Sequence, residues 1–198
     1  DLHFEKGRNV GGLNKEPYSG KDTGTKTKWK PDLEVFTDIN IPSDNFRITM
    51  KRQAVVNAGV TFKLRNETTP GKFETTEYRY DNGIVDYVTE LAGENSLTLP
   101  VFWQTERRGR DRADKDEYKL RADFSFCVSN MVDRLEYYHN SSFLEHGGSP
   151  ERAVKTAFVS AVDKRLKTLG KYNKNEAKVT FADVEDCLVL VTNSFSAN

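Results

Sequence analysis

The stretch Tyr118-Lys119-Leu120-Arg121-Ala122-Asp123-Phe124-Ser125-Phe126-Cys127-Val128 alternates large apolar side chains with polar or small ones. A period of two is typical of a β-strand, and it predicts a sheet whose apolar face is buried. Residues 99–104 are the expected hairpin partner of this strand. Between the two, residues 105–117 carry charges of both signs at nearly every position. Such a run indicates a solvated hairpin tip.

Helical patterns and a short apolar run follow this hairpin toward the C-terminus. Ser149 and Pro150 predict the start of the longest helix, which ends at Gly170. Its apolar stripe comprises Ala153, Val154, Ala157, Phe158, Ala161, Val162, Leu166 and Leu169. Thr180 and Asp183 have the spacing of a helix capping box, and residues 188–191 predict a buried strand. Residues 137–142, polar and aromatic, are interpreted as a connection.

The N-terminal part combines short strands with two helices. Residues 2–6, 23–30, 60–65 and 72–80 have strand character, and 7–20 is interpreted as a connection. Ser43 predicts the start of a helix that ends before Gly59. A short helix follows the turn Asp81-Asn82-Gly83 and stops at Gly93. The sequence therefore predicts an α+β protein with a domain boundary at this turn.

Composition excludes several classes of protein. The chain has 198 residues with 30 Lys+Arg and 30 Asp+Glu, a net charge of zero, and 11% aromatic residues, which excludes a disordered chain. Because overall basicity is missing, contact with DNA must come from a local patch. Cys127 and Cys187 indicate reduced thiols in a cytoplasmic protein, and no apolar run predicts a membrane span. The N-terminus, which begins at Asp1 with a strand-like run, predicts an excised piece of a longer protein.

Few side chains have a pattern that indicates chemistry. No glycine-rich phosphate loop is present in the sequence, and no pair of carboxylates has a spacing that indicates acid–base catalysis. His3, His139 and His146 are far apart, so a zinc site is not expected. We therefore predict no catalytic residue and no metal ligand.

Arginines in the charged segment are the candidate DNA contacts. Arg107, Arg108, Arg110 and Arg112 follow Trp103, and guanidinium groups on a hairpin tip neutralise phosphates without reading sequence. Neighbouring acidic residues cancel much of this charge, so a solvated surface is the competing interpretation.

Five motifs, in this order along the chain, resemble the B subunits of bacterial type IIA DNA topoisomerases, DNA gyrase B and topoisomerase IV B. They lie at 22–36, which begins Asp22-Thr23-Gly24-Thr25, at 55–66, at 78–88, at 140–149 with its paired glycines, and at 180–191. Together they cover nearly the whole chain. The sequence is therefore identified as a fragment of this family, with gyrase and topoisomerase IV both open.

The resemblance implies a fold and a division of the chain. Residues 1–82 would be the C-terminal portion of an ATPase domain of the GHKL class. Residues 83–198 would be the transducer domain, similar to the second domain of ribosomal small-subunit protein five, with a mixed sheet packed by helices and a left-handed βαβ crossover. Thr25 matches a threonine that helps to fix the adenine-recognising carboxylate; a β-branched residue in a strand is the competing interpretation.

The resemblance also implies a function. The full-length enzyme would bind ATP and Mg²⁺, dimerise, act with the A-type subunit on double-stranded DNA, and couple ATP hydrolysis to strand passage in the cytoplasm. The fragment alone would be inactive and would hold no nucleotide. One alternative is a stand-alone DNA- or partner-binding module that uses the Arg107–Arg112 hairpin. Another is a different GHKL ATPase, such as a mismatch-repair or chaperone relative.

Overall fold

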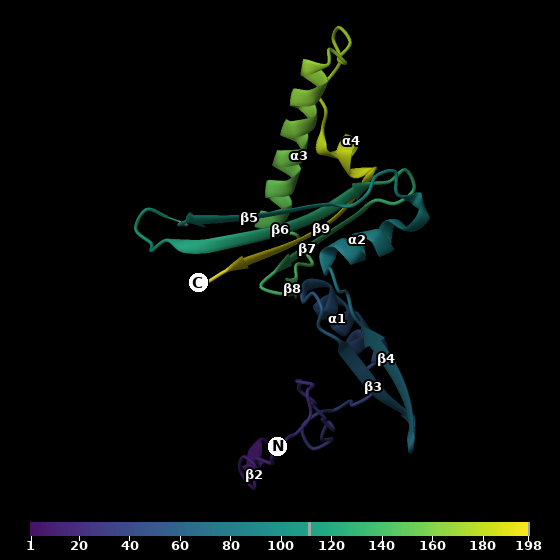
Figure 1. Cartoon of the computed structure of the whole chain (residues 1–198), viewed down its shortest axis with the longest axis vertical. Coiled ribbons are helices and arrows are strands. Elements are labelled where there is room, and N and C mark those ends of the chain that lie inside the picture. The colour runs from purple at the N-terminus through teal and green to yellow at the C-terminus, as the bar shows by residue number, and fades with distance from the viewer. Residues whose placement is uncertain (111, 198) are drawn as a thin grey trace. The chain divides into compact units, whose positions relative to one another are not determined.

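The computed structural model describes residues 1–110 and 112–197, and the chain divides into two compact units, Asp1–Pro42 and Ser43–Asn198 (Figure 1). In the first unit, β1 (His3–Glu5) and β2 (Arg8–Val10) form an antiparallel hairpin. Lys6 and Gly7 make its turn with positive φ angles of 48° and 76°. The strand β2 lies within the predicted connection 7–20. The expected strand at 2–6 is confirmed.

The expected strand at 23–30 is wrong. These residues are exposed and irregular in the structure. Alternating threonines and lysines favour an extended backbone, but a strand is stabilised by its hydrogen-bonded neighbour and by side-chain packing. No described strand pairs with this segment.

The second unit begins with α1 (Ser43–Val56), a hairpin of β3 (Phe62–Thr69) and β4 (Lys72–Tyr78), and α2 (Ile84–Ala92). A short 3₁₀ turn, η1 (Gly93–Asn95), follows α2. The strands pair in register from Phe62 opposite Tyr78. These elements confirm the two predicted helices and the predicted strand pair.

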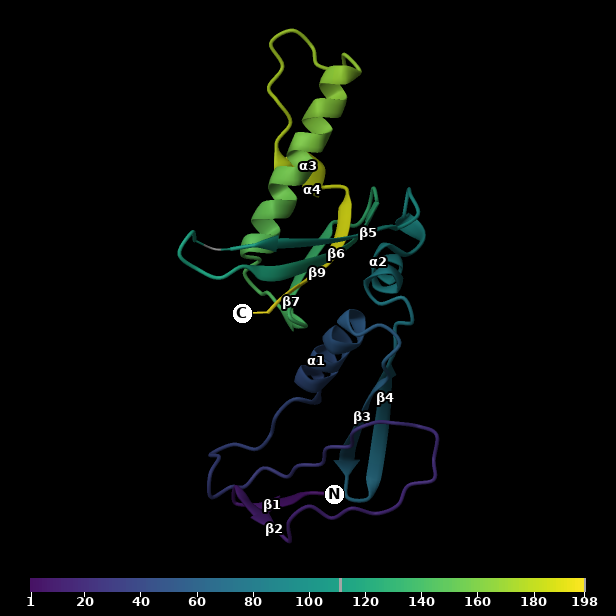
Figure 2. The ribbon, with the colours of Figure 1, turned by 60° about the vertical axis from the view of Figure 1, so that its left-hand side comes forward.

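A five-stranded sheet forms the centre of the second unit, in the order β5-β6-β9-β7-β8. Figure 2 shows β5, β6, β9 and β7 of this sheet. Its strands are β5 (Val101–Gly109), β6 (Tyr118–Val128), β7 (Arg134–His139), β8 (Ser142–Phe143) and β9 (Leu188–Ser196). The middle strand β9 is antiparallel to β6 and parallel to β7. The chain crosses from β7 to β9 through α3 (Ser149–Thr168) and α4 (Phe181–Glu185). The predicted α+β class with a mixed, helix-packed sheet is confirmed, and the left-handed sense of the crossover stays a prediction.

Two predictions about this sheet are wrong in an informative way. Residues 137–142 include half of β7, a strand that is buried on both faces and therefore lacks the two-residue period of a half-exposed strand. On β6, the supposedly solvated face carries Asp123, Ser125 and Cys127, and all three are buried. The apolar face, with Phe124 and Phe126, is only half-buried. Helices cover both faces of the sheet, so the polarity of the β6 side chains did not indicate which of its faces is more deeply buried.

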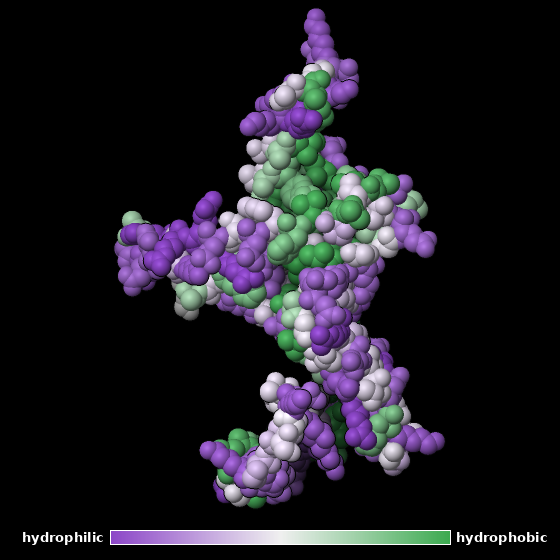
Figure 3. All heavy atoms as spheres, in the orientation of Figure 1, coloured by the Kyte–Doolittle hydropathy of each residue, from purple (hydrophilic) through white to green (hydrophobic). Residues whose placement is uncertain are grey.

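Two hydrophobic clusters hold the unit together. The first joins Val55 of α1 and Val88 of α2 to Cys127, Val189 and Val191 on one face of the sheet. The second, on the opposite face, packs Val154 and Phe158 of α3 against that side of the sheet. The predicted stripe on α3 is only partly covered, because its alanines are exposed. Figure 3 shows this apolar surface along α3.

The first cluster crosses the predicted domain boundary at Gly83. Ala54 and Val55, on one side of the boundary, are fully buried against residues on the other side. The compact unit begins at Ser43, well before that turn. Helix α1 and the β3–β4 hairpin therefore share a core with the sheet.

Candidate functional site

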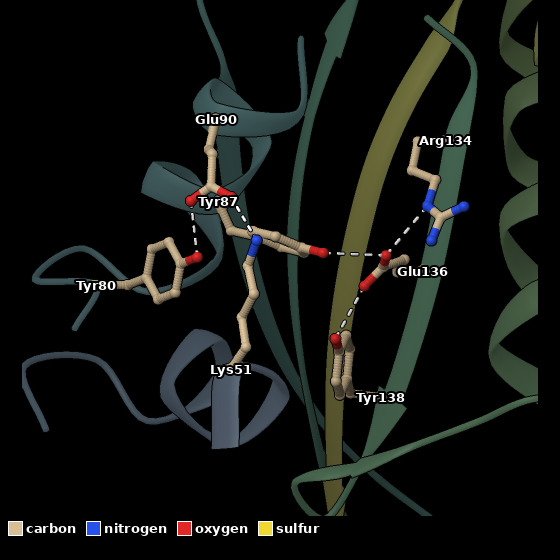
Figure 4. A network of polar contacts seen from close by, with 7 residues as sticks. All are labelled: Lys51, Tyr80, Tyr87, Glu90, Arg134, Glu136 and Tyr138. Atoms are coloured by element: carbon tan, nitrogen blue, oxygen red, sulfur yellow. Dashed lines mark hydrogen bonds and ion pairs between the residues drawn. The ribbon is translucent and has the colours of Figure 1, made fainter. Parts of the chain in front are cut away.

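A buried carboxylate, Glu136 on β7, lies at the centre of a polar network (Figure 4). Its side chain is only 5% exposed. Tyr87 of α2 donates a hydrogen bond from its hydroxyl to Oε1 at 3.1 Å, and Tyr138 of β7 donates one to Oε2 at 2.9 Å. Arg134 donates from Nε to Oε1 at 3.1 Å. Because a buried charge is costly without partners, these three donors are what keeps the carboxylate in the core.

A second group of contacts joins α1 to α2. Lys51 of α1 donates from Nζ to Glu90 of α2 at 2.6 Å, and Tyr80 donates from its hydroxyl to the other oxygen of Glu90 at 2.7 Å. The Lys51 ammonium also lies 5.4 Å from the centre of the Tyr87 ring, within the range of a cation–π contact. Tyr87 therefore belongs to both groups, and the contacts form one chain from α1 through α2 to β7.

The protonation states follow from this geometry. Burial, and then the neighbouring Glu136 carboxylate, raise the pKa of Tyr87 and Tyr138 well above the usual value. Burial and the hydrogen bond to Glu90 raise the pKa of Tyr80. Burial opposes ionisation of Glu90, but hydrogen bonds from Lys51 and Tyr80 leave its pKa below the usual value. The tyrosines thus remain protonated hydrogen-bond donors near pH 7, and the network joins α1, α2 and β7.

Thr25, the predicted nucleotide contact, lies in the irregular part of the first unit and is exposed. A cavity of about 550 Å³ in that unit is lined by Phe4, Trp29, Phe36 and neighbouring residues, and Thr25 is not among them.

The four arginines do not form one surface. Arg107 and Arg108 lie on β5 rather than on the hairpin tip, opposite Leu120 and Lys119, and as neighbours on a strand they point to opposite faces. The predicted tip at 105–117 is thus too long, because β5 continues to Gly109. Arg110 donates to Glu117 at 2.8 Å, and Arg112 lies 3.6 Å from Asp114. Half of the predicted arginine charge is therefore paired with neighbouring carboxylates.

The three histidines belong to separate segments of the chain. His3 is on β1, His146 precedes α3, and His139 on β7 has its two ring nitrogens 2.9 and 3.2 Å from the hydroxyls of Ser194 and Ser196. Among the residues that the structure describes, no cluster of His, Cys, Asp or Glu has the geometry of a metal site.

No local sequence pattern predicted the polar network. The one local signal for it is Glu136, a carboxylate between aromatic and apolar neighbours at 135–138. A charged residue in such a run is typical of a satisfied buried group. Its partner Tyr87 is 49 residues distant in the chain, and no local period predicts that contact.

Comparisons with known proteins agree with this fold. The family model described as DNA gyrase B matches residues 83–198. The B subunit of DNA gyrase from Spiroplasma citri is 25% identical over 193 residues, which cover 96% of this chain and 29% of that protein. The B subunit of DNA topoisomerase 4 from Streptococcus pneumoniae is 22% identical over 169 residues, which cover 85% of this chain and 24% of that protein. The chain thus spans less than a third of the length of these relatives.

Two solved structures share the fold. The ATPase domain of Thermus thermophilus gyrase B, in complex with an aminocoumarin, has a TM-score of 0.60 at 20% identity over 85% of this chain and 43% of its own. The ATP-binding domain of Francisella tularensis topoisomerase IV, in complex with an inhibitor, has a TM-score of 0.57 at 18% identity over 85% of this chain and 42% of its own. Since the family match extends from Gly83 to the end of the sequence, more than half of its length, the chain belongs to the DNA gyrase B family.

Proposed function

We propose that this chain is the coupling region of an ATP-dependent type IIA DNA topoisomerase, which links ATP binding and hydrolysis to DNA strand passage. The match to the DNA gyrase B family over 83–198 is the observation that carries the proposal. Relaxation, supercoiling and decatenation are the possible outcomes of strand passage. The match does not favour the alternative of a stand-alone module that binds through the Arg107–Arg112 hairpin.

The network and the first hydrophobic cluster supply the physical basis for coupling. In this proposal, residues 1–82 are the C-terminal portion of the ATPase domain and 83–198 the transducer domain. Helix α1, before the boundary, is joined to α2 by the Lys51–Glu90 ion pair and to the sheet by Val55. Packed elements of this kind move together because cores resist continuous deformation. A displacement of α1 is therefore passed to α2 and the sheet.

ATP and Mg²⁺ belong to the proposed full-length enzyme. The residues described here do not fit a nucleotide site by themselves, since Thr25 is exposed and the described part of the chain holds no acidic cluster for a metal. We assign Thr25 an indirect role in adenine recognition and no step of catalysis to this chain. The chain alone is then expected to bind no ATP at micromolar concentration, and saturable binding in a calorimetric titration contradicts this assignment.

Coupling is tested by removing the charge of Lys51. In the full-length protein with its A-type subunit, Lys51→Met keeps the aliphatic stem but loses the ion pair with Glu90. A partly exposed pair contributes about 0.2–1 kcal/mol, so we expect ATP hydrolysis to continue while strand passage per ATP falls about two- to fivefold. Lys155→Met is the matched control, because Lys155 pairs with Glu151 within α3. Equal effects of the two variants contradict the proposed role of Lys51.

The arginines are proposed as DNA contacts of the full-length enzyme. Each phosphate contact contributes about 0.9 to the slope of log affinity against log salt concentration. Reversing the charge at Arg107, Arg108 and Arg110 should therefore lower both DNA affinity and that slope. If neither changes, these residues do not contact DNA.

The remaining parts of the proposal concern partners and location. We infer double-stranded DNA, the A-type subunit and a second copy of the full-length protein as partners, and the cytoplasm as location. No helix in the described part of the chain is long and apolar enough to cross a membrane.

A further inference from the structure

Among the described strands, β5 lies at one end of the sheet and pairs with a single neighbour, β6. The opposite end is the two-residue strand β8, which offers a much shorter ladder of backbone groups than β5. A nine-residue edge strand leaves a row of backbone N–H and C=O groups available for pairing. Such edges bind a further strand by extending the sheet.

The side chains of β5 are unusually apolar for an edge. Val101, Phe102 and Trp103 are 49%, 50% and 55% exposed. Trp103 rests with one face on Phe124, at 5.3 Å between ring centres. Soluble proteins usually protect an edge of this length with lysines, prolines or a covering element. The apolar half of β5 is therefore an unpartnered surface.

The other half of β5 carries arginines, whose guanidinium groups can pack on the aromatic side chains of the apolar half in a second copy. An antiparallel copy of β5, centred on Thr105, places Trp103 opposite Arg107 and Phe102 opposite Arg108 of the second copy. Guanidinium groups over aromatic rings attract one another. Gln104 then lies opposite Glu106, to which it can donate a hydrogen bond. This register places no like charges directly opposite each other.

Other registers are less favourable. Only every second residue of β5 directs its N–H and C=O groups to the free edge. In a pair of identical strands, each residue must therefore lie opposite a residue whose number differs from its own by an even amount. If the centre of the pairing moves by one residue to 106, Glu106 lies opposite Glu106 of the second copy. If the centre moves to 104, the ladder shortens to residues 101–107 and Phe102 lies opposite Glu106. A centre at 107 places Arg107 opposite Arg107. Pro100, which has no N–H, ends the ladder just before Val101. The register with the best charge complementarity is thus also the longest one.

We propose that β5 is a self-recognition edge, through which two copies of this chain pair in antiparallel fashion about Thr105. The proposal is independent of the coupling function. It predicts a weak, concentration-dependent dimer of the 198-residue chain, populated at about 100 µM, because the contact is small.

Cysteine cross-linking tests both the surface and the register. In Thr105→Cys the two thiols face each other across the two-fold axis, with Cα atoms about 4.5–5.5 Å apart, within reach of a disulfide. In Val101→Cys, at a position opposite Gly109 that makes none of the proposed aromatic–arginine contacts, the same atoms lie eight residues apart along the strands, about 26 Å, which is out of reach. Mild oxidation should therefore give a covalent dimer of Thr105→Cys and not of Val101→Cys. The unaltered chain, with Cys127 buried and Cys187 half-buried, controls for the native thiols.

Sedimentation equilibrium supplies an independent measurement. Trp103→Ala removes two symmetric Trp–Arg contacts and should weaken dimerisation at least about tenfold. Met131→Ala, at a side chain 74% exposed outside β5, is the matched control and should leave it unchanged. Circular dichroism establishes that both variants are folded. A monomer at all concentrations, or equal cross-linking of the two cysteine variants, overturns the proposal.

Discussion

Replacement of Glu136 tests whether the buried carboxylate holds the second unit together. In Glu136→Gln the side chain keeps one acceptor oxygen, and an NH₂ group replaces the other. The tyrosine hydroxyl that faces this NH₂ group must then accept a hydrogen bond instead of donating one. Hydrogen bonds to a charged group contribute about 1.5–3 kcal/mol and neutral ones about 1 kcal/mol. Arg134 is 58% exposed, so its pairing contributes little. Since removal of a buried charge recovers part of its desolvation cost, we expect a net loss of about 1–3 kcal/mol.

Glu136→Leu should cost more than the glutamine variant. It leaves the hydroxyls of Tyr87 and Tyr138 without an acceptor, and both side chains are buried. Each unsatisfied hydroxyl costs about 1–3 kcal/mol, and breaking a buried charged network costs about 3–5 kcal/mol in total.

Urea unfolding followed by circular dichroism measures both losses. Glu77→Gln is the matched control, because Glu77 pairs with Lys63 on the exposed β3–β4 hairpin and should change stability by less than about 0.5 kcal/mol. The role assigned to Glu136 is refuted if Glu136→Gln matches this control, or if the leucine variant is the more stable of the two Glu136 variants.

Three further predictions concern the same unit. Gly83→Ala should lower the free energy of unfolding by about 1–3 kcal/mol, because Gly83 has φ +57° and a Cβ there would lie 3.2 Å from the Val55 carbonyl oxygen. Gly71→Ala is the control for the same urea assay and should cost less, because Gly71 has φ +78° but open space around it. Val55→Ala, in the fully buried core, should lower stability by about 2 kcal/mol in a single calorimetric transition; separate transitions for α1 and the sheet would contradict a shared core. Burial, and to a smaller extent nearby carboxylates, raises the pKa of four tyrosines in the folded protein. As pH rises, these tyrosines therefore ionise in the unfolded chain before they ionise in the folded one. The tyrosines therefore do not reduce the free energy of unfolding below about pH 10, and above it each one reduces that free energy by up to about 1.4 kcal/mol per pH unit. An absorbance titration of the folded protein in which all four ionise near pH 10 would contradict this prediction. The four are Tyr80, Tyr87, Tyr137 and Tyr138.

Elements with a clear local period were predicted well from the sequence. The strand at 118–128 has the predicted bounds, and Gly170, with φ +59°, follows the end of α3. The capping box of Thr180 and Asp183 is present in both directions, and its hydrogen bonds lower the pKa of Asp183. Each of these features depends on residues within a few positions of one another, so the sequence carries the whole signal.

Features that depend on distant partners were predicted badly. Residues 23–30 have strand propensity but no described strand beside them, and β7 has the burial of a central strand without the alternation of an exposed one. The arginines looked like one cluster because they are close in sequence, yet the alternation of strand side chains places Arg107 and Arg108 on opposite faces.

The sequence by itself determined the family, the α+β class, and the helices and strands whose periods and end signals are local. Only the tertiary structure decided which face of β6 is deepest, that α1 shares a core with the sheet across Gly83, and that Glu136 is held by Tyr87. The physical reason is that burial depends on what covers a face. Helix α2 packs on the polar face of β6, and the hydrogen-bond partners of a buried carboxylate come from segments that only folding brings together.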